Sequence, residues 1–280
     1  MPFAFSAPAT WRFWRRAPVV PAVRLSGVIG QIGLAGRGLT LSGLERVLDQ
    51  AFAVKGAPAV ALLVNSPGGS PVQSALIAGR IRALAERKKR PVLAFVEDVA
   101  ASGGYWLACA ADEILADASS IVGSIGVISA GFGFQEAIAR LGVERRVHTT
   151  GPRKALLDPF RPEREDDLEL LRSIQGEIHG RFIAWVRERR GARLERARGE
   201  LFDGRVWTGA AAVEQGLIDG LGEARAVVRA RFGQKVRLLP VNPRQSWLMR
   251  RLRFRSEPAH ILADALEVLE ARAHWQRFGL

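Results

Sequence analysis

The stretch PVLAFVEDVAASGGYW (residues 91–106) decides the fold. Its first half is apolar enough for a buried strand, and the turn Ser102-Gly103-Gly104 then opens a short helix. The run PAVALLVNSPGGS (58–70) repeats this order, with an apolar strand, a glycine-rich turn and a helix after it. Short apolar strands that alternate with helices predict an α/β fold with a largely parallel sheet.

The same patterns extend to both sides of this stretch. We expect strands at 22–30, 112–117, 126–129 and 143–150, and helices at 41–53 and 131–141. The charged stretch 163–200 has a helical period, and 204–235 reads as a helix, turn, strand and helix.

The chain has 280 residues, which suits one large α/β domain with a helical extension or two small domains. We predict a flexible basic and aromatic tail at 1–20, an α/β domain at 21–240 and a basic helical extension at 241–280. Its content of 48% apolar and 25% charged residues is ordinary for a folded globular protein.

The net charge of +13 favours anionic partners, and only five of the 41 basic residues are lysine. No RNA-binding signature or zinc-finger spacing is present, so we expect no nucleic-acid role. Aromatic and cationic residues are mixed at 11–16, and LMRRLRFR (248–255) is also basic. Contact with an anionic membrane is one interpretation of these segments, and a solvated tail and helix are the other. No apolar run approaches the ~20 residues that span a bilayer, and the start lacks a signal-peptide core. We therefore expect a cytoplasmic protein, peripheral at the inner membrane if it binds lipid.

Histidine, cysteine and metal chemistry have few candidates. The chain contains four histidines, three of them in its helical second half, and one cysteine. Cys109 and His148 could form a thiol dyad, but Cys109 lies in the apolar run WLACAA, which favours a buried and inert thiol. No histidine pair has metal-ligand spacing, and no Walker loop occurs, so we expect no metal and no cofactor.

Two glycine-rich turns, Asn65 to Ser70 and Ala100 to Tyr105, follow buried strands and are the best site candidates. Ligands of open α/β sheets lie beyond the carboxyl ends of strands. Ser102 there resembles a nucleophile elbow, although a serine beside two glycines is more often a cap or a turn former. Lys154 can act as a base where arginine cannot, because only lysine loses its proton when it is desolvated; a surface lysine is the alternative.

Five ordered segments resemble signal peptide peptidase A, a family of Ser-Lys peptidases classified as peptidase family S49. They are Asn65 to Gly69, Ala101 to Trp106, Gly123 to Val127, the lysine loop Gly151 to Phe160, and Gly204 to Gly209 followed by Gly216 to Asp219. The resemblance covers residues 22 to 235. It implies a Clp-protease/crotonase-like fold with repeated ββα units and a helical C-terminal extension.

The resemblance also implies roles for individual residues. Ser102 attacks the scissile carbonyl, Lys154 is the general base, and Ser124 orients the lysine amine. The backbone N–H groups of Gly69 and Gly103 form the oxyanion hole. Family members form homo-oligomers, tetramers or octamers, in which neighbouring subunits complete each site. The implied substrates are extended peptides, including residual signal peptides and membrane-associated peptides.

We expect no N-terminal membrane anchor of the kind that is usual in this family, and the sequence corresponds to the short form without internal duplication. Three alternatives remain open. One is a related Ser-Lys peptidase of the Clp-like group that cuts membrane-associated proteins. Another is a catalytically silent scaffold that binds a partner or the membrane surface. The third is a crotonase-type acyl-CoA enzyme, against which the Ser-Lys pair argues.

Overall fold

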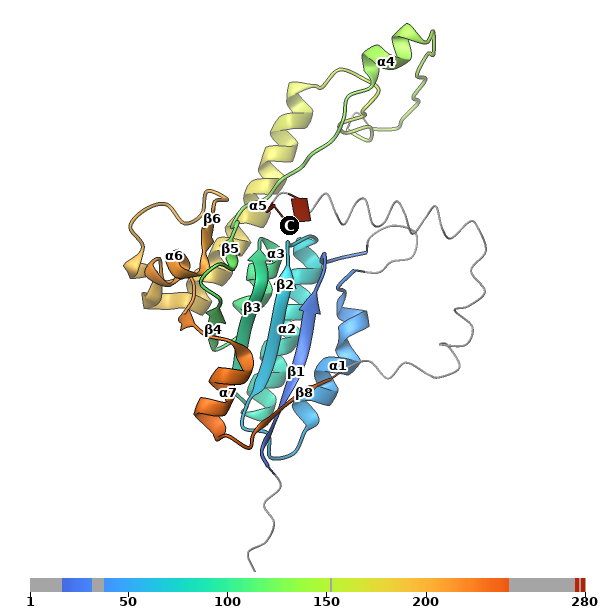
Figure 1. The fold of residues 1–280 in the computed structure, drawn as a ribbon. Coiled ribbons are helices and arrows are strands. Elements are labelled where there is room, and N and C mark those ends of the chain that lie inside the picture. Colours follow the sequence, from blue (N-terminus) through green and yellow to red (C-terminus); the bar gives the residue numbers. More distant parts are fainter. Residues whose placement is uncertain (1–16, 32–37, 152, 242–274, 277, 280) are drawn as a thin grey trace, which may run out of the picture.

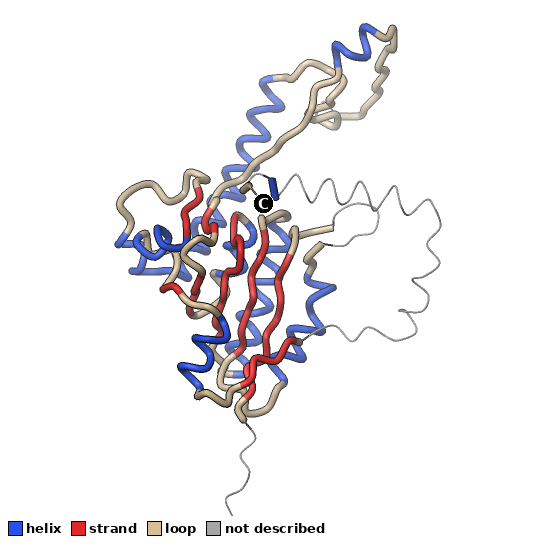
Figure 2. Tube along the Cα trace, viewed as in Figure 1, coloured by secondary structure: helices blue, strands red, loops and turns tan. Residues whose placement is uncertain are grey.

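The computed structural model describes residues 17–31, 38–151, 153–241, 275–276 and 278–279. Within these residues the chain forms one sheet, whose main path has the strand order β6-β5-β3-β2-β1-β8 (Figures 1 and 2). The strands are β1 (Val19–Ser26), β2 (Val60–Ser66), β3 (Val92–Ala101), β4 (Glu113–Ala116), β5 (Ile121–Gly123), β6 (Val206–Thr208), β7 (Gly220–Leu221) and β8 (Arg237–Pro240). β4 pairs with β3 and β7 beside the main path. Among the described pairings only β5 with β6 is antiparallel, so the expected largely parallel sheet is confirmed.

The central strands are apolar because both faces of the sheet are covered. Alternate residues of β1 enter different clusters. Val23 and Leu25 belong to the larger core, while Val20 and Ala22 face the smaller one. The larger core contains residues of α1 (Leu41–Ala53), α2 (Pro71–Lys88), α3 (Gly103–Ala108) and α5 (Glu165–Arg190), and the smaller core contains residues of α7 (Ala224–Phe232). The sheet is therefore the middle layer of three.

Side-chain caps fix where the first two helices begin. Thr40 accepts a hydrogen bond of 3.2 Å from the N–H of Gly43 at the start of α1. Ser70 does the same for Gln73 at the start of α2, and Pro71 occupies the first helical position, where no N–H is needed. The expected helix at 41–53 is confirmed to the residue.

Residues from about 128 to the first turns of α5 form an arm that projects from the sheet (Figure 1). It contains the short helix α4 (Gln135–Arg140), and most of its side chains are exposed, with Phe132 at 81%. Asp158 organises the arm locally, because its buried carboxylate accepts from the N–H of Phe160 and from the Arg145 side chain. The arm is thus held by its own contacts.

After α5 the chain returns to the sheet through η1 (Gly191–Arg196), β6, α6 (Gly209–Glu214), β7, α7 and β8. This order matches the strand–helix units that the Clp-protease/crotonase-like prediction requires, and that fold class is confirmed. The predicted strands at 126–129 and 143–150 are wrong. Both segments leave the sheet along the arm, where no neighbouring strand can pair with them. The predicted helix at 131–141 is reduced to α4, since Gly131 and Gly133 precede it.

The division into tail, domain and extension at 1–20, 21–240 and 241–280 stays a prediction. Residues 1–16 and 242–274 lie outside the described part of the chain, and so do the basic segments at 11–16 and 248–255. None of the described helices is both long enough and apolar enough to cross a membrane.

Candidate active site

Three turns meet at the carboxyl ends of β2, β3 and β5. Ser66 on β2 pairs with Ala100 on β3, and Ala101 pairs with Gly123 on β5. The residues that follow these pairs are therefore neighbours, because parallel strands end at the same edge of a sheet. The turns 66–70, 102–104 and 124–126 form one surface, at the edge where open α/β sheets bind ligands.

Ser102 has a backbone conformation that L-residues rarely adopt, with φ 52° and ψ −122°. It stands at the N-terminus of α3, and its N–H donates a 2.8 Å hydrogen bond to the carbonyl of Gly123. Its own carbonyl accepts from the N–H of Trp106 at 3.0 Å. Such a conformation persists only where the surroundings enforce it, and strained positions of this kind cluster at functional sites.

The first glycine turn packs directly on the second. A Cβ atom at Gly68 would lie 2.8 Å from the Cβ of Ser102 and 3.0 Å from the nitrogen of Gly103. A Cβ at Gly103 would lie 2.4 Å from the hydroxyl oxygen of Ser74. Glycine is required at Gly68 because the two turns approach so closely, and at Gly103 because the Ser74 side chain leaves no room for a Cβ atom.

The amides of Gly69 and Gly103 are available as donors. Ile29 pairs with the residues on either side of Gly69, since it donates to the Gly68 carbonyl and accepts from the Ser70 N–H. No acceptor for the Gly69 or Gly103 N–H occurs in the part of the chain that the structure describes. Two free amides beside a hydroxyl can stabilise an oxyanion that forms where the hydroxyl attacks a carbonyl.

Ser124 lies at the equivalent point of the neighbouring strand. Ser102 follows Ala101 and Ser124 follows Gly123, and these two residues are register partners. Ser124 also has a φ of 52°, and its N–H donates 2.7 Å to the carbonyl of Arg205. The structure therefore brings Ser102, Ser124, Gly69 and Gly103 to one edge of the sheet.

Lys154 is not brought to this edge by its own chain. It lies on the arm between α4 and α5, with an exposed side chain. Its loop is anchored within the arm, where the Asp167 carboxylate accepts from the N–H of Leu157 at 3.4 Å. The pKa of Asp158 is held below its usual range, first by the N–H of Phe160 and then by the guanidinium of Arg145, so this carboxylate stays charged in the loop.

Side chains of α5 donate hydrogen bonds to carbonyls at the end of α3, the short helix that follows Ser102. The sequence did not reveal this contact. The indole N–H of Trp185 donates to the Trp106 carbonyl at 3.0 Å. The guanidinium of Arg189 donates to the carbonyls of Cys109 at 2.9 Å and Ala111 at 3.0 Å. These donors occupy carbonyls that a helix end leaves without partners.

His179 was also missed, because it lies in the helical second half of the chain, far in sequence from the three turns. Its Nε2 lies 3.1 Å from the carbonyl oxygen of Ile125, the residue after Ser124. No local pattern could reveal this contact, since the two residues are 54 positions apart and meet through the path of α5.

The surroundings of Cys109 disfavour thiol chemistry. Burial raises the pKa of its thiol to about 12, and the side chain is fully enclosed. His148, the partner in the thiol-dyad interpretation, is exposed on the arm. The expected buried thiol is therefore confirmed.

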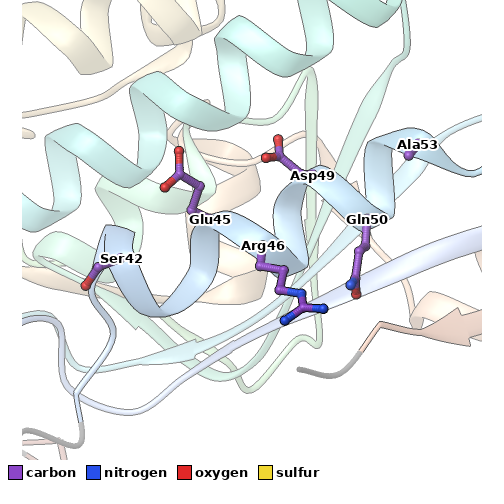
Figure 3. Close-up of a pocket in the computed structure, with 6 residues that line it drawn as sticks. All are labelled: Ser42, Glu45, Arg46, Asp49, Gln50 and Ala53. Carbon is purple, nitrogen blue, oxygen red and sulfur yellow. The ribbon is translucent and has the colours of Figure 1, made fainter. Parts of the chain in front are cut away.

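Two surface hollows lie elsewhere. One of about 520 Å3 is lined by a single face of α1 (Figure 3), and one of about 470 Å3 lies between the end of α5 and residues 194–202. Neither contains a residue of the three turns. Among the described residues, no group of three or more histidine, cysteine and carboxylate side chains could hold a metal ion.

The profile of peptidase family S49 matches residues 84–236. A relative from Synechocystis sp. that is named as a protease is 31% identical over 259 residues, which are 90% of each chain. A Na+/H+ antiporter NhaA of Brucella abortus is 50% identical over 272 residues, 93% of this chain.

The chain spans only 37% of that antiporter's length. Among solved structures, a mutant of the 1510-N membrane-bound stomatin-specific protease is similar to this chain, with a TM-score of 0.49 and 16% identity. The similarity covers 81% of this chain and 99% of that one.

Proposed function

Because the chain belongs to peptidase family S49, we propose that it is a serine endopeptidase in which Ser102 is the nucleophile and Lys154 is the general base. The observation that carries this proposal is the position of Ser102. It is held at φ 52° at the start of α3, beside the amides of Gly69 and Gly103. A serine that were only a helix cap would need neither the strained backbone nor the two free donors.

The proposed reaction is acyl transfer to Ser102. The neutral amine of Lys154 takes the hydroxyl proton as the serine oxygen attacks the peptide carbonyl, and it then protonates the leaving amine. The N–H groups of Gly69 and Gly103 stabilise the oxyanion, a contribution in which one donor is typically worth about 3 kcal/mol. Ser124 orients the lysine amine by a hydrogen bond. Water then hydrolyses the acyl-enzyme with the same base.

We propose that the base comes from a second subunit. Lys154 lies in the projecting arm, whereas Ser102 directly follows β3 at the carboxyl edge of the sheet. An arm of one subunit that reaches the sheet edge of the next would bring a Lys154 to each Ser102 and shield the amine from water, as a neutral lysine requires. The functional form is then a closed homo-oligomer, a tetramer or an octamer.

The proposed substrates are extended peptides, residual signal peptides and membrane-associated peptides among them. The Brucella relative is named as an antiporter, and its similarity to almost the whole of this chain supports a substrate or partner at the membrane. A catalytically silent scaffold is the other candidate. The joint presence of Ser102, Ser124 and Lys154 argues against it, since a scaffold has no need of all three.

The test is labelling of the assembled protein by a fluorophosphonate probe, with Ser102→Ala, Lys154→Ala and Lys154→Arg as variants. We expect labelling of the unaltered protein alone. Arginine keeps the positive charge but cannot accept a proton. Labelling of Ser102→Ala would remove this residue from the mechanism, and full labelling of Lys154→Arg would show that charge alone is needed. A folded, assembled protein without labelling would favour the scaffold.

A further inference from the structure

The end of the sheet opposite the three turns carries a dense group of cations, here called the basic pole. It consists of Lys55, Arg87, Lys88, Lys89, Arg90, Lys235 and Arg237. Four of the five lysines of the chain belong to it. They come from the turn after α1, from the end of α2 and the turn that follows it, and from the segment that leads into β8 together with its first residue. These parts lie at the lower end of Figure 1.

The contacts of these turns place them together. β2 and β3 begin side by side, with Val60 paired to Val92, and the Arg90 side chain donates to the carbonyl of Val54, beside Lys55. On the other side, Arg237 pairs with Val19 at the start of β1, and its N–H donates to the Pro18 carbonyl at 3.0 Å. The basic pole is therefore one surface across the amino ends of the strands.

Carboxylates near this surface are already engaged. Asp112 pairs with Arg82 at 2.7 Å and with Arg189 at 3.4 Å, and Glu113 pairs with Arg231. Within the described residues, none of the seven pole cations forms a salt bridge, and six of them are exposed. On the arm, by contrast, the arginines at 140, 145, 146 and 161 all pair with carboxylates. The positive charge of the pole is available to a partner.

We propose that the basic pole docks on an anionic lipid bilayer. Exposed cations that face a bilayer are attracted by its negative surface potential. Lipid is favoured over nucleic acid by the segment that joins the chain here. Residues 1–16 precede β1, so they are attached at this pole, and within them Trp11, Phe13 and Trp14 stand among arginines. Aromatic and cationic residues in this mixture are typical of the bilayer interface.

Docking at this pole orients the molecule. Ser102 follows directly after β3, whose ten residues begin beside the pole, so roughly 30 Å separate the two ends at about 3.3 Å per residue. The turns of the candidate active site would then face away from the bilayer. The proposal does not depend on the peptidase assignment, since the pole and the turns share no residue.

Co-sedimentation with vesicles tests the proposal. The full chain is mixed with phosphatidylcholine vesicles that contain 30% or no phosphatidylglycerol, at low and high salt. The pole variant Lys55→Glu/Lys88→Glu/Lys235→Glu is compared with Arg181→Glu/Arg196→Glu/Arg198→Glu, which changes the net charge equally on exposed residues outside the pole. Circular dichroism verifies that both variants are folded.

We expect binding to the anionic vesicles only, weakened by salt. The affinity of the pole variant for anionic vesicles should fall by about tenfold or more, because each cation near the surface adds to the attraction. The affinity of the control variant should fall much less. Three outcomes overturn the proposal. They are absence of binding at low salt, equal loss in both variants, and binding to duplex RNA at the same salt without binding to vesicles.

Discussion

The N–H of Ser102 donates a hydrogen bond of 2.8 Å to the carbonyl oxygen of Gly123. This bond ties the proposed nucleophile to the strand that leads into Ser124, so the two serines are held by one backbone contact. Both residues have a φ of 52°, and each follows the last paired residue of its strand. The positions of the two side chains therefore depend on the same sheet edge, and changes to the surrounding backbone should affect catalysis before they affect folding.

Gly68→Ala should reduce kcat/KM by about a hundredfold or more, since displacement of reacting groups by about 1 Å has effects of this size. The new Cβ would lie 2.8 Å from that of Ser102, at a φ of +108° that alanine rarely adopts. Gly79→Ala is the matched control, because nothing lies within 4 Å of its Cβ. Fluorophosphonate labelling rates and circular dichroism measure the effect. Equal rates in both variants would contradict the close packing of the two turns.

His179→Ala should lower kcat by about five- to tenfold with little change in KM, the effect of one lost hydrogen bond at a positioned segment. The ring contacts the Ile125 carbonyl and not the substrate site itself. His179→Gln supplies an amide N–H donor and should recover much of the activity. If alanine and glutamine behaved alike in steady-state kinetics, His179 would have only a packing role.

Ser102→Ala and Lys154→Ala are each expected to be inactive, but their mixture should regain activity if sites form between subunits. An equal mixture that exchanges subunits freely yields about a quarter of the full activity, because each site needs an intact serine and an intact lysine from different chains. Peptide hydrolysis after mild dissociation and reassembly measures this. Mass spectrometry verifies that subunits have exchanged. If the exchanged mixture stays inactive, both residues act within one chain.

Asp219→Asn should destabilise the fold by about 3 kcal/mol, since it leaves the buried Arg190 without its charged partner. Burial acts to raise the pKa of Asp219, but hydrogen bonds from Arg190 and the Ile114 N–H outweigh it and lower the pKa. The stabilisation is thus complete above the unfolded pKa of about 3.9 and is lost as the pH falls through the lower folded pKa. In denaturant unfolding, the difference in free energy of unfolding between the variant and the parent protein should become smaller at acidic pH.

Glu97→Gln serves as the control for that measurement. Glu97 forms an exposed pair with Arg24, and such pairs contribute about 1 kcal/mol or less. A loss as large as that of Asp219→Asn would indicate that burial of Arg190 is not the cause.

Cys109 should resist iodoacetamide in the folded protein at pH 8, where a thiol with a pKa of about 12 is almost wholly protonated. The same reagent should label it fully in denaturant. Mass spectrometry measures the labelling. Rapid labelling of Cys109 in the native state would show that the region around α3 opens far more often than its packing indicates.

The sequence predicted the sheet side of the candidate site well and the arm poorly. The strand–glycine–helix patterns around Gly69 and Ser102 are local, so their residues alone place them at one sheet edge. The segments 126–129 and 143–150 have the same apolar character as true strands. Such a segment forms a strand only if the fold places it beside another strand, and that placement depends on the tertiary course of the chain. For the same reason the contacts of His179, Trp185 and Arg189 could not be predicted, since they depend on the course of α5.

The placement of Lys154 on the arm has a consequence for how the enzyme stays inactive before it assembles. On the proposed mechanism, a newly made subunit is a protease without a base, and it needs no propeptide to stay latent. Activity then depends steeply on the concentration of subunits, and dilution inactivates the enzyme by dissociating them. Mutations that loosen the arm, far from any substrate, would behave like inhibitors of assembly.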